Sequence, residues 1–292
     1  MKITIAGSLG NIGKPLTQIL TGQAHHVTVI SSSTERQAEI EALGAKAAIG
    51  SVNDADFLSG AFAGADAVFT MTPPNIGGSN IIANTTKAGE AFAAAIKQSG
   101  VKRVVMLSSI GADVPQGTGP IAGLYNIEQI FNGLNNIDIT FLRAGYFYTN
   151  FYNDVPMIKH MDIMGGNFPE NAQLVLVHPR DIAAAAAKAL QGTSTGKNVE
   201  YIVSDVVTPA QVAKALGSAA GKPQLPWVEF TDEQSLQGMT QAGLPQEIAG
   251  LYTEMGAGLR TGIIAAHFID TKAPVNGTTK LEDFAQEFKT QF

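Results

Sequence analysis

The chain has 292 residues, of which 45% are hydrophobic and 15% charged, with a net charge of −6. This composition is typical of a well-buried globular protein, with one large domain or a core domain that carries a smaller one, and it excludes a disordered chain. A negative charge without a basic run argues against nucleic acid and acidic membranes as partners, and the lack of cysteine excludes disulfides and zinc–thiolate sites. No leader-like or membrane-spanning run is found, so we expect a cytoplasmic protein.

Three glycines recur three residues apart at the start of the chain, directly after a short apolar run. Residues 3–6 alternate as a strand does, and apolar residues recur at helical spacing between 12 and 20. Glycines between a strand and a helix allow a tight turn and a close approach to phosphates, and the helix N-terminus offers free N–H groups. We predict a dinucleotide pyrophosphate site, the alternative being a purely structural turn. Its residues are Gly7, Ser8, Gly10, Asn11, Ile12 and Gly13.

The end of the second predicted strand, at 27–31, indicates which dinucleotide binds. An acidic side chain there accepts a hydrogen bond from the 2′-hydroxyl of NAD, whereas hydroxyl groups and an arginine bind the 2′-phosphate of NADP. The sequence offers Ser31, Ser32, Ser33 and Arg36. We therefore predict NADP(H) in preference to NAD(H). The alternative role of these hydroxyls is to cap the next helix, with Thr34 as its N-cap, and the two roles are compatible.

Strands and helices continue to alternate through the first half of the chain. Strands are predicted at 45–49, 67–71, 101–107 and 138–142, and helices ending near 62, at 79–99 and at 121–134. Repeated alternation without hairpin signals predicts a doubly wound parallel sheet of the Rossmann type, an α/β fold.

The fourth strand ends in Thr72-Pro73-Pro74-Asn75. Two prolines stop the strand ladder and stiffen the turn. Because ligands bind at the carboxyl edge of such a sheet, Thr72 and Pro73 are predicted to flank the cofactor. The alternative is a stiff turn that touches no ligand.

The composition changes after Arg143. Five aromatic residues lie within 146–152, an alanine-rich helix opens at His178-Pro-Arg-Asp181, and a strand is predicted at 199–203. Helices fill about 208–259, and a last amphipathic helix covers 280–288. His178, Arg180 and Asp181 could form a catalytic set, but we interpret Pro179 and Asp181 as helix initiation, with His178 packed nearby. We predict that 1–145 form the NAD(P)-binding core and 146–292 a smaller α+β substrate-binding region, partly interleaved with it.

The glycine turn, the ADAVFTMTPPN strand and the LRAGYFYTNF and HPRDIAAAAAKAL segments together resemble the NmrA-like family of atypical short-chain dehydrogenases/reductases. The likeness covers nearly the whole chain and is strongest up to about residue 190. It implies a Rossmann core, an NAD(P) site and a small C-terminal region that forms the substrate site. The family includes quinone and azo-dye reductases, isoflavone-type reductases and redox-sensing regulators, so the resemblance leaves the activity open.

Typical short-chain dehydrogenases move a proton with a Tyr-x-x-x-Lys pair and an upstream serine. Here Ser108 and Ser109 end the fifth strand, Tyr125 lies on the next helix, and Gln129 stands in place of the lysine. Without an ammonium neighbour the Tyr125 hydroxyl is a weak acid but still a hydrogen-bond donor. We name Tyr125 and Ser109 as candidate catalytic residues and Ser108 as a cofactor contact. The alternative for Tyr125 is packing under the loop 108–119.

The missing lysine does not exclude hydride transfer to a quinone or azo bond, because that reaction depends chiefly on holding the acceptor close to the nicotinamide. Tyr146, Phe147 and Phe151 are predicted to stack with a flat acceptor, the alternative being core or lid packing. We predict an NADPH-dependent oxidoreductase acting on quinone-like or other small conjugated acceptors. The alternative is a non-catalytic NAD(P)-binding redox sensor that acts through a protein partner. No metal site is predicted, and a homodimer is left open.

Overall fold

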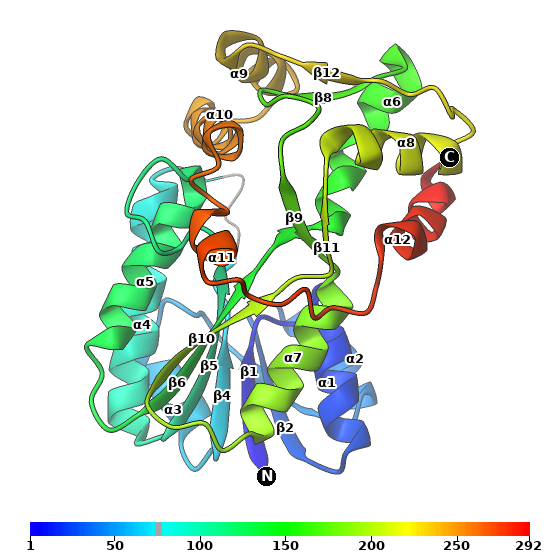
Figure 1. Cartoon of the computed structure of the whole chain (residues 1–292). Helices are drawn as coiled ribbons and strands as arrows, with labels where there is room; N and C mark the ends of the chain where they lie inside the picture. Colours follow the sequence, from blue (N-terminus) through cyan, green and yellow to red (C-terminus); the bar gives the residue numbers. More distant parts are fainter. Residues whose placement is uncertain (74–77) are drawn as a thin grey trace.

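The computed structural model describes residues 1–73 and 78–292 (Figure 1). Its centre is a parallel sheet of seven strands in the order β10-β6-β5-β4-β1-β2-β3. The strands are β1 (Lys2–Ala6), β2 (His26–Ser31), β3 (Lys46–Ile49), β4 (Ala67–Thr70), β5 (Arg103–Ser109), β6 (Asp138–Ala144) and β10 (Lys197–Ile202). The chain starts in the middle of the sheet, winds to one edge and returns to build the other, so the predicted doubly wound Rossmann-type sheet is confirmed.

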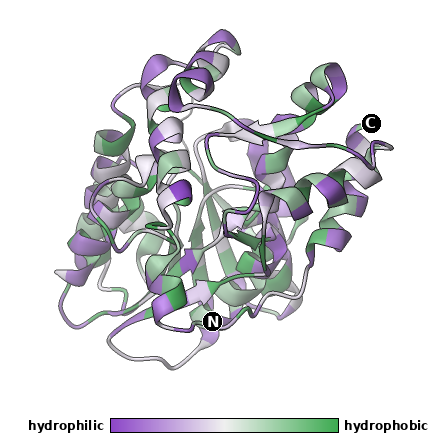
Figure 2. Ribbon diagram, turned by 45° about the horizontal axis from the view of Figure 1, so that its top comes forward, coloured by the Kyte–Doolittle hydropathy of each residue, from purple (hydrophilic) through white to green (hydrophobic). Residues whose placement is uncertain are grey.

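Helices cover both faces of the sheet (Figure 1). One face carries α1 (Gly13–Gly22), α2 (Gln37–Ala42) and α7 (Pro179–Gln191), and the other α3 (Ala55–Phe62), α4 (Ile81–Ser99) and α5 (Ala122–Asn132). In Figure 2 the strands at the centre are mostly green, whereas the helices around them carry both green and purple residues, as amphipathic helices do. None of the described helices has both the length and the apolar character that a membrane span needs.

One helix and one strand begin two residues later than predicted, each for a local reason. Helix α4 begins at Ile81 rather than 79, because Asn80 has a positive φ of 53°, which an α-helix cannot contain. Strand β5 begins at Arg103, where pairing with Asp138 of β6 starts, since Gly100 first reverses the chain in a left-handed conformation.

The predicted strand at 199–203 is β10, the seventh strand of the main sheet. It runs parallel to β6, with Tyr201 opposite Arg143. Helix α7 likewise packs on the main sheet, through Ile182 and Leu190. The chain therefore leaves the core after β6 and returns to it before the last strand is added.

The remaining elements form a smaller α+β region with its own apolar core. Its strands are β7 (Tyr146–Phe147), β8 (Met164–Gly166), β9 (Leu174–Val177), β11 (Asp205–Val207) and β12 (Trp227–Glu229), in one three-stranded and one two-stranded sheet. Its helices are α6 (Val155–Met161), α8 (Pro209–Ala219), α9 (Asp232–Gln241), α10 (Gln246–Thr261), α11 (Ala266–Asp270) and α12 (Leu281–Phe288).

Helix α10 bridges the two parts through carboxylates. Glu247 accepts hydrogen bonds from the N–H groups of Asn80 and Ile81, each at 2.7 Å, at the start of α4. Glu254 accepts from the N–H of Gly117 at 2.7 Å, in the loop after β5. Both contacts lie on segments that follow the carboxyl ends of β4 and β5, so α10 lies at the edge of the sheet where a ligand is predicted.

Candidate functional site

The loop between β1 and α1 makes a tight turn at the carboxyl edge of the sheet. The backbone φ is +143° at Gly7 and +53° at Ser8. Residues other than glycine rarely adopt such positive φ angles, so the turn at Ser8 is unusual. A Cβ on Gly13 would lie 2.0 Å from the carbonyl oxygen of Ser8, so the third glycine is required where the helix meets the loop. A Cβ on Gly10 would meet nothing closer than 4.0 Å, so this glycine faces outward.

The N-terminus of α1 receives no side-chain cap. Its N-cap residue, Ile12, makes no side-chain hydrogen bond, and the first turn contains no acid. Within residues 1–73 and 78–292, the N–H groups of Leu9, Gly10, Asn11 and Ile12 donate no hydrogen bond. Free N–H groups at the positive end of a helix dipole favour an anion. The loop therefore fits a dinucleotide pyrophosphate.

Hydroxyl groups at the end of β2 organise the segment that follows. The Oγ of Ser31 accepts from the N–H of Ser33 at 3.2 Å and from the Oγ of Ser8 at 3.1 Å. The Oγ of Ser33 accepts from the N–H of Glu35 at 3.2 Å and so caps the short 3₁₀ helix η1 (Thr34–Arg36). The prediction of Thr34 as N-cap is wrong, because the extended backbone is at Ser33 and Thr34 already lies in the first turn.

Two cations beside these serines share one carboxylate. The Nζ of Lys14 lies 3.1 Å from Glu39 Oε1, and Nη1 of Arg36 lies 3.3 Å from Glu39 Oε2. The hydrogen bond from Lys14 and the charges of both cations lower the pKa of Glu39. Ser32 is exposed and makes no hydrogen bond with the described residues. A phosphate dianion offers both cations stronger acceptors than the carboxylate does.

Lys14 was not among the predicted site residues. It lies on α1 directly after the last glycine of the motif, and its reach toward Arg36 becomes visible only when α1 and η1 are placed side by side. The signal in the sequence was its position in the first turn of a helix whose N-terminus is predicted to hold phosphate.

Thr72 and Pro73 follow β4 at the carboxyl edge, with Thr72 half-buried and Pro73 exposed. The rest of the predicted stiff turn, Pro74 and Asn75, lies outside the described residues. Contact of Thr72 and Pro73 with the cofactor stays a prediction.

The two serines that end β5 have different partners. The Oγ of Ser108 donates to buried Glu128 of α5 at 2.5 Å, whereas the Oγ of Ser109 donates to the carbonyl of Ile110 at 2.9 Å. Ser108 is buried and Ser109 half-buried, so Ser109 has the more accessible hydroxyl. Tyr125 is half-buried and makes no side-chain hydrogen bond within the described chain. Its pairing with Ser109 stays a prediction.

Glu128 and Arg143 form a buried ion pair under Ser108. Arg143 donates from Nη2 to Glu128 Oε2 at 2.7 Å and from Nε to Oε1 at 3.0 Å, and the two side chains are 7% and 2% exposed. Arg143 also donates to the hydroxyl of Tyr201 at 3.3 Å and lies 3.5 Å from Asp113. These contacts join the ends of β5, β6 and β10. This pair was not predicted from the sequence, because its partners are 15 residues apart on different elements.

Most of the aromatic rings after β6 pack within the smaller region. Tyr148 stacks on Phe284 of α12 with ring centroids 5.3 Å apart, and Tyr152 stacks on Phe288 at 5.8 Å. Both rings therefore pack in the apolar core of the smaller region.

The three rings predicted to bind the acceptor differ in exposure. Phe151 is 3% exposed and packs on Tyr146 with centroids 5.5 Å apart. Tyr146 and Phe147 are half-buried. Phe151 thus has little surface for an acceptor and supports Tyr146 from behind, so Tyr146 and Phe147 are the better placed of the three.

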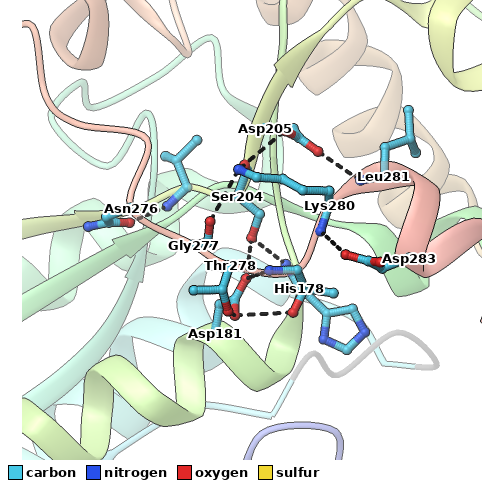
Figure 3. Close-up of polar contacts among 12 residues, drawn as sticks. His178, Asp181, Ser204, Asp205, Asn276, Gly277, Thr278, Lys280, Leu281 and Asp283 are labelled. Atoms are coloured by element: carbon cyan, nitrogen blue, oxygen red, sulfur yellow. Dashed lines mark hydrogen bonds and ion pairs between the residues drawn. The ribbon is translucent and has the colours of Figure 1, made fainter.

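The His178–Asp181 segment begins a helix, as predicted. His178 is the N-cap of α7, its Nδ1 accepts from the N–H of Arg180 at 3.0 Å, and its burial lowers its pKa. Asp181 has a further role that the sequence did not indicate (Figure 3). Its carboxylate accepts from Ser204 Oγ at 2.7 Å and, with Thr278 and Thr279 as donors, holds the segment that leads to α12.

Two hollows in the described structure lie away from the glycine loop. One, of about 430 Å³, is at the amino edge of the sheet and is lined by residues such as Lys2, His26 and Lys46. The other, of about 300 Å³, lies beside α5 over β6 and β10 and includes Gln129 and Lys197. Neither contains a residue of the glycine loop or of the aromatic segment, so neither belongs to the predicted site.

Comparison with known proteins agrees with this geometry. The model of the NmrA-like family matches residues 1–257. The chain is 30% identical to the NAD(P)H azoreductase of Xenophilus azovorans, over 94% of this chain and 93% of the azoreductase.

Two solved structures share the fold over almost the whole chain. The NADPH complex of an NADPH-dependent quinone oxidoreductase from Escherichia coli has a TM-score of 0.81 at 20% identity, covering 98% of this chain and 99% of the other. The NADP(H) complex of the triphenylmethane reductase from Citrobacter sp. has a TM-score of 0.76 at 20% identity, covering 99% and 100%.

Proposed function

The chain belongs to the NmrA-like family, and from this we propose that it is an NADPH-dependent oxidoreductase that reduces small conjugated acceptors such as quinones and azo compounds. Its relative at 30% identity is an azoreductase, and two proteins of the same fold are reductases of quinones and of triphenylmethane dyes. These substrates are flat, conjugated molecules that accept a hydride.

The observation that carries the proposal is the uncapped start of α1 beside a pair of cations. The free N–H groups of residues 9–12 hold the pyrophosphate. Lys14 and Arg36, with the hydroxyl of Ser32, hold the 2′-phosphate that distinguishes NADPH from NADH. Ser31 and Ser33 support this subsite through their hydrogen bonds. NADPH, when bound, supplies the hydride.

The protein's own contribution to the reaction is to position the acceptor beside the nicotinamide. Tyr146 and Phe147 follow β6 at the carboxyl edge and present half-buried rings to a flat acceptor. Holding two reactants in contact removes much of the entropic barrier to hydride transfer, so a Tyr–Lys pair is not required.

The test is oxidation of NADPH, followed at 340 nm, in the presence of a panel of quinones and azo dyes. We expect turnover above the protein-free blank with at least one acceptor, and a lower KM for NADPH than for NADH. If no acceptor is reduced although NADPH binds, the enzymatic proposal is wrong.

One observation favours a second function, that of a redox sensor. Gln129 stands where typical relatives have lysine, and with Asn132 it lines an accessible hollow beside the edge strand β10, where a partner protein can reach. The sensor binds the cofactor without turnover. It would retain a partner in a pull-down with only one of the two redox states of the cofactor.

A further inference from the structure

Glu39, in the first turn of α2, holds the two cations that we assign to the 2′-phosphate. Its Oε1 accepts a hydrogen bond from the Nζ of Lys14 at 3.1 Å, and its Oε2 accepts one from Nη1 of Arg36 at 3.3 Å. Each oxygen of the carboxylate thus binds one cation, as two oxygens of a phosphate group would. In the protein without a dinucleotide, the carboxylate of Glu39 therefore neutralises the charges that a 2′-phosphate needs.

The partners of Glu39 place it at the predicted cofactor site. Lys14 belongs to the uncapped first turn of α1, directly after the glycine loop, and Arg36 ends η1, the short helix that follows β2. The glycine loop and the end of β2 are in contact, because Ser8 Oγ donates to Ser31 Oγ at 3.1 Å. Glu39 therefore connects the start of α1 with the segment after β2, where proteins of this fold bind the adenosine ribose of a dinucleotide.

The fold does not depend on these two ion pairs. The side chain of Glu39 is 41% exposed, and those of Lys14 and Arg36 are each 48% exposed. Exposed ion pairs contribute little to stability, because water screens the charges and two long side chains must be ordered. Among the described residues the carboxylate of Glu39 has no other partner. Its removal should leave the structure intact, so that an effect on ligand binding can be measured directly.

We propose that Glu39 is a specificity-determining residue that competes with the 2′-phosphate of NADPH for Lys14 and Arg36; the assignment rests on the proposed function. On binding of NADPH, both cations turn to the 2′-phosphate and the carboxylate of Glu39 is released into water. On binding of NADH, which lacks this phosphate, Glu39 stays paired with both cations. Glu39 therefore weakens the binding of NADPH but not of NADH, and it narrows the preference between the two cofactors.

The sign of the effect follows from the charges. A phosphate dianion is a stronger acceptor than a carboxylate and can displace it from both cations. Two cations and one carboxylate leave one net positive charge in the subsite, and loss of the carboxylate leaves two. If Glu39 instead served to hold the cations in position for the phosphate, its loss would weaken NADPH binding. The two roles therefore predict changes of opposite sign.

The magnitude of the effect follows from the two exposed ion pairs that NADPH must break. One exposed pair changes an equilibrium constant by a factor of about 1.4 to 5, so two pairs together give a factor of about 2 to 30. Removal of the like charge beside the phosphate acts in the same direction. Loss of Glu39 should therefore lower the Kd of NADPH about tenfold.

The experiment is a calorimetric titration of wild type, Glu39→Gln and Glu41→Gln with NADPH and with NADH, without an acceptor. We expect Glu39→Gln to lower the Kd of NADPH about tenfold and to change the Kd of NADH less than about twofold. Glu41→Gln is the control, because Glu41 lies on the same helix, accepts a hydrogen bond from Gln37 at 2.9 Å and has no cationic partner in the described chain. This control removes the same charge and should leave both constants close to those of wild type.

Two further titrations separate competition from general repulsion. In a protein that carries both Lys14→Ala and Arg36→Ala, the additional change Glu39→Gln should lose most of its effect on NADPH, because the cations for which it competes are gone. High salt should also narrow the difference between Glu39→Gln and wild type, because it screens exposed charges. An unchanged or higher Kd of NADPH in Glu39→Gln, an equal fall for NADH, or an undiminished effect without the two cations would overturn the proposal.

These titrations also distinguish this proposal from the proposed function, because they measure binding without turnover. If wild type binds NADPH and Glu39→Gln binds it no more tightly, only the role of Glu39 is wrong. If wild type does not bind NADPH, the proposed function itself is wrong.

Discussion

Replacing Asp181 by alanine tests how the last segment of the chain is attached to the core. The carboxylate accepts four hydrogen bonds: from Ser204 Oγ at 2.7 Å, Thr279 N–H at 3.0 Å, Thr278 Oγ1 at 3.1 Å and Thr279 Oγ1 at 3.2 Å. The side chain donors belong to the loop after β10 and to the segment before α12 (Figure 3). Asp181 itself is 9% exposed.

The expected loss follows from these four bonds. A hydrogen bond to a charged group contributes about 1.5–3 kcal/mol, so four independent ones would sum to about 6–12 kcal/mol. Bonds within one network are not additive, and the hydroxyls of Ser204 and Thr278 can turn toward water. We therefore expect Asp181→Ala to lower the free energy of unfolding by about 3–5 kcal/mol, the order found when buried charged networks are broken.

The pH dependence of the loss has a definite sign. Burial opposes ionisation of Asp181, but the hydrogen bonds from Ser204, Thr279 and Thr278 outweigh it and lower its pKa. A lowered pKa stabilises the folded state above the unfolded-state value of about 3.9, and this stability is lost as the pH falls through the folded-state value. The difference between wild type and Asp181→Ala should be constant at neutral pH and shrink only below about pH 4.

Urea unfolding at pH 7 measures the effect. Circular dichroism follows the whole chain, and fluorescence of Trp227, the single tryptophan, follows the smaller region. Trypsin should cleave after Lys280 faster in Asp181→Ala than in wild type. The reason is that Thr278 and Thr279, just before Lys280, lose their hydrogen bonds to Asp181. Asp270→Ala, at an exposed position, is the control. A loss below about 1 kcal/mol with unchanged proteolysis would refute the reasoning.

Three further predictions concern the cofactor site and the core. Arg36→Ala should weaken NADPH binding by about 1–3 kcal/mol and leave NADH binding nearly unchanged, since it removes a charge-assisted contact to the 2′-phosphate; equal losses in a calorimetric titration would contradict that role. Gly13→Ala should raise the dissociation constants of NADPH and NADH at least tenfold, because the new Cβ would lie 2.0 Å from the carbonyl oxygen of Ser8; unchanged dissociation constants would show that the glycine loop does not bind the pyrophosphate. Glu128→Gln should lower the free energy of unfolding in urea by about 3–5 kcal/mol, because it removes the nearer of the two counter-charges of buried Arg143; an unchanged free energy would show that Asp113 alone is a sufficient counter-charge.

Local patterns were enough to predict the fold of the first half of the chain. Each strand there is a short apolar run, each helix has an apolar stripe, and Gly7, Gly10 and Gly13 mark the turn between them. The preference for NADP(H) also came from residues close in sequence, Ser31 to Arg36. These signals are readable because they depend on neighbours along the chain.

The missed features depend on contacts between distant segments. Glu39 and Lys14 are separated by 25 residues and meet only because α1 and α2 begin near the same edge of the sheet. Asp181 binds residues almost 100 positions away.

The late addition of β10 determines the order in which a nascent chain can fold. Six strands of the sheet have been synthesised by Ala144, but the seventh follows only at Lys197–Ile202, and α7, which covers one face, precedes it at Pro179–Gln191. Until β10 has been synthesised and has left the ribosome, β6 pairs only with β5, and its other side is an open sheet edge that other chains can reach. Chaperone binding to stalled nascent chains should therefore peak between these two points of translation.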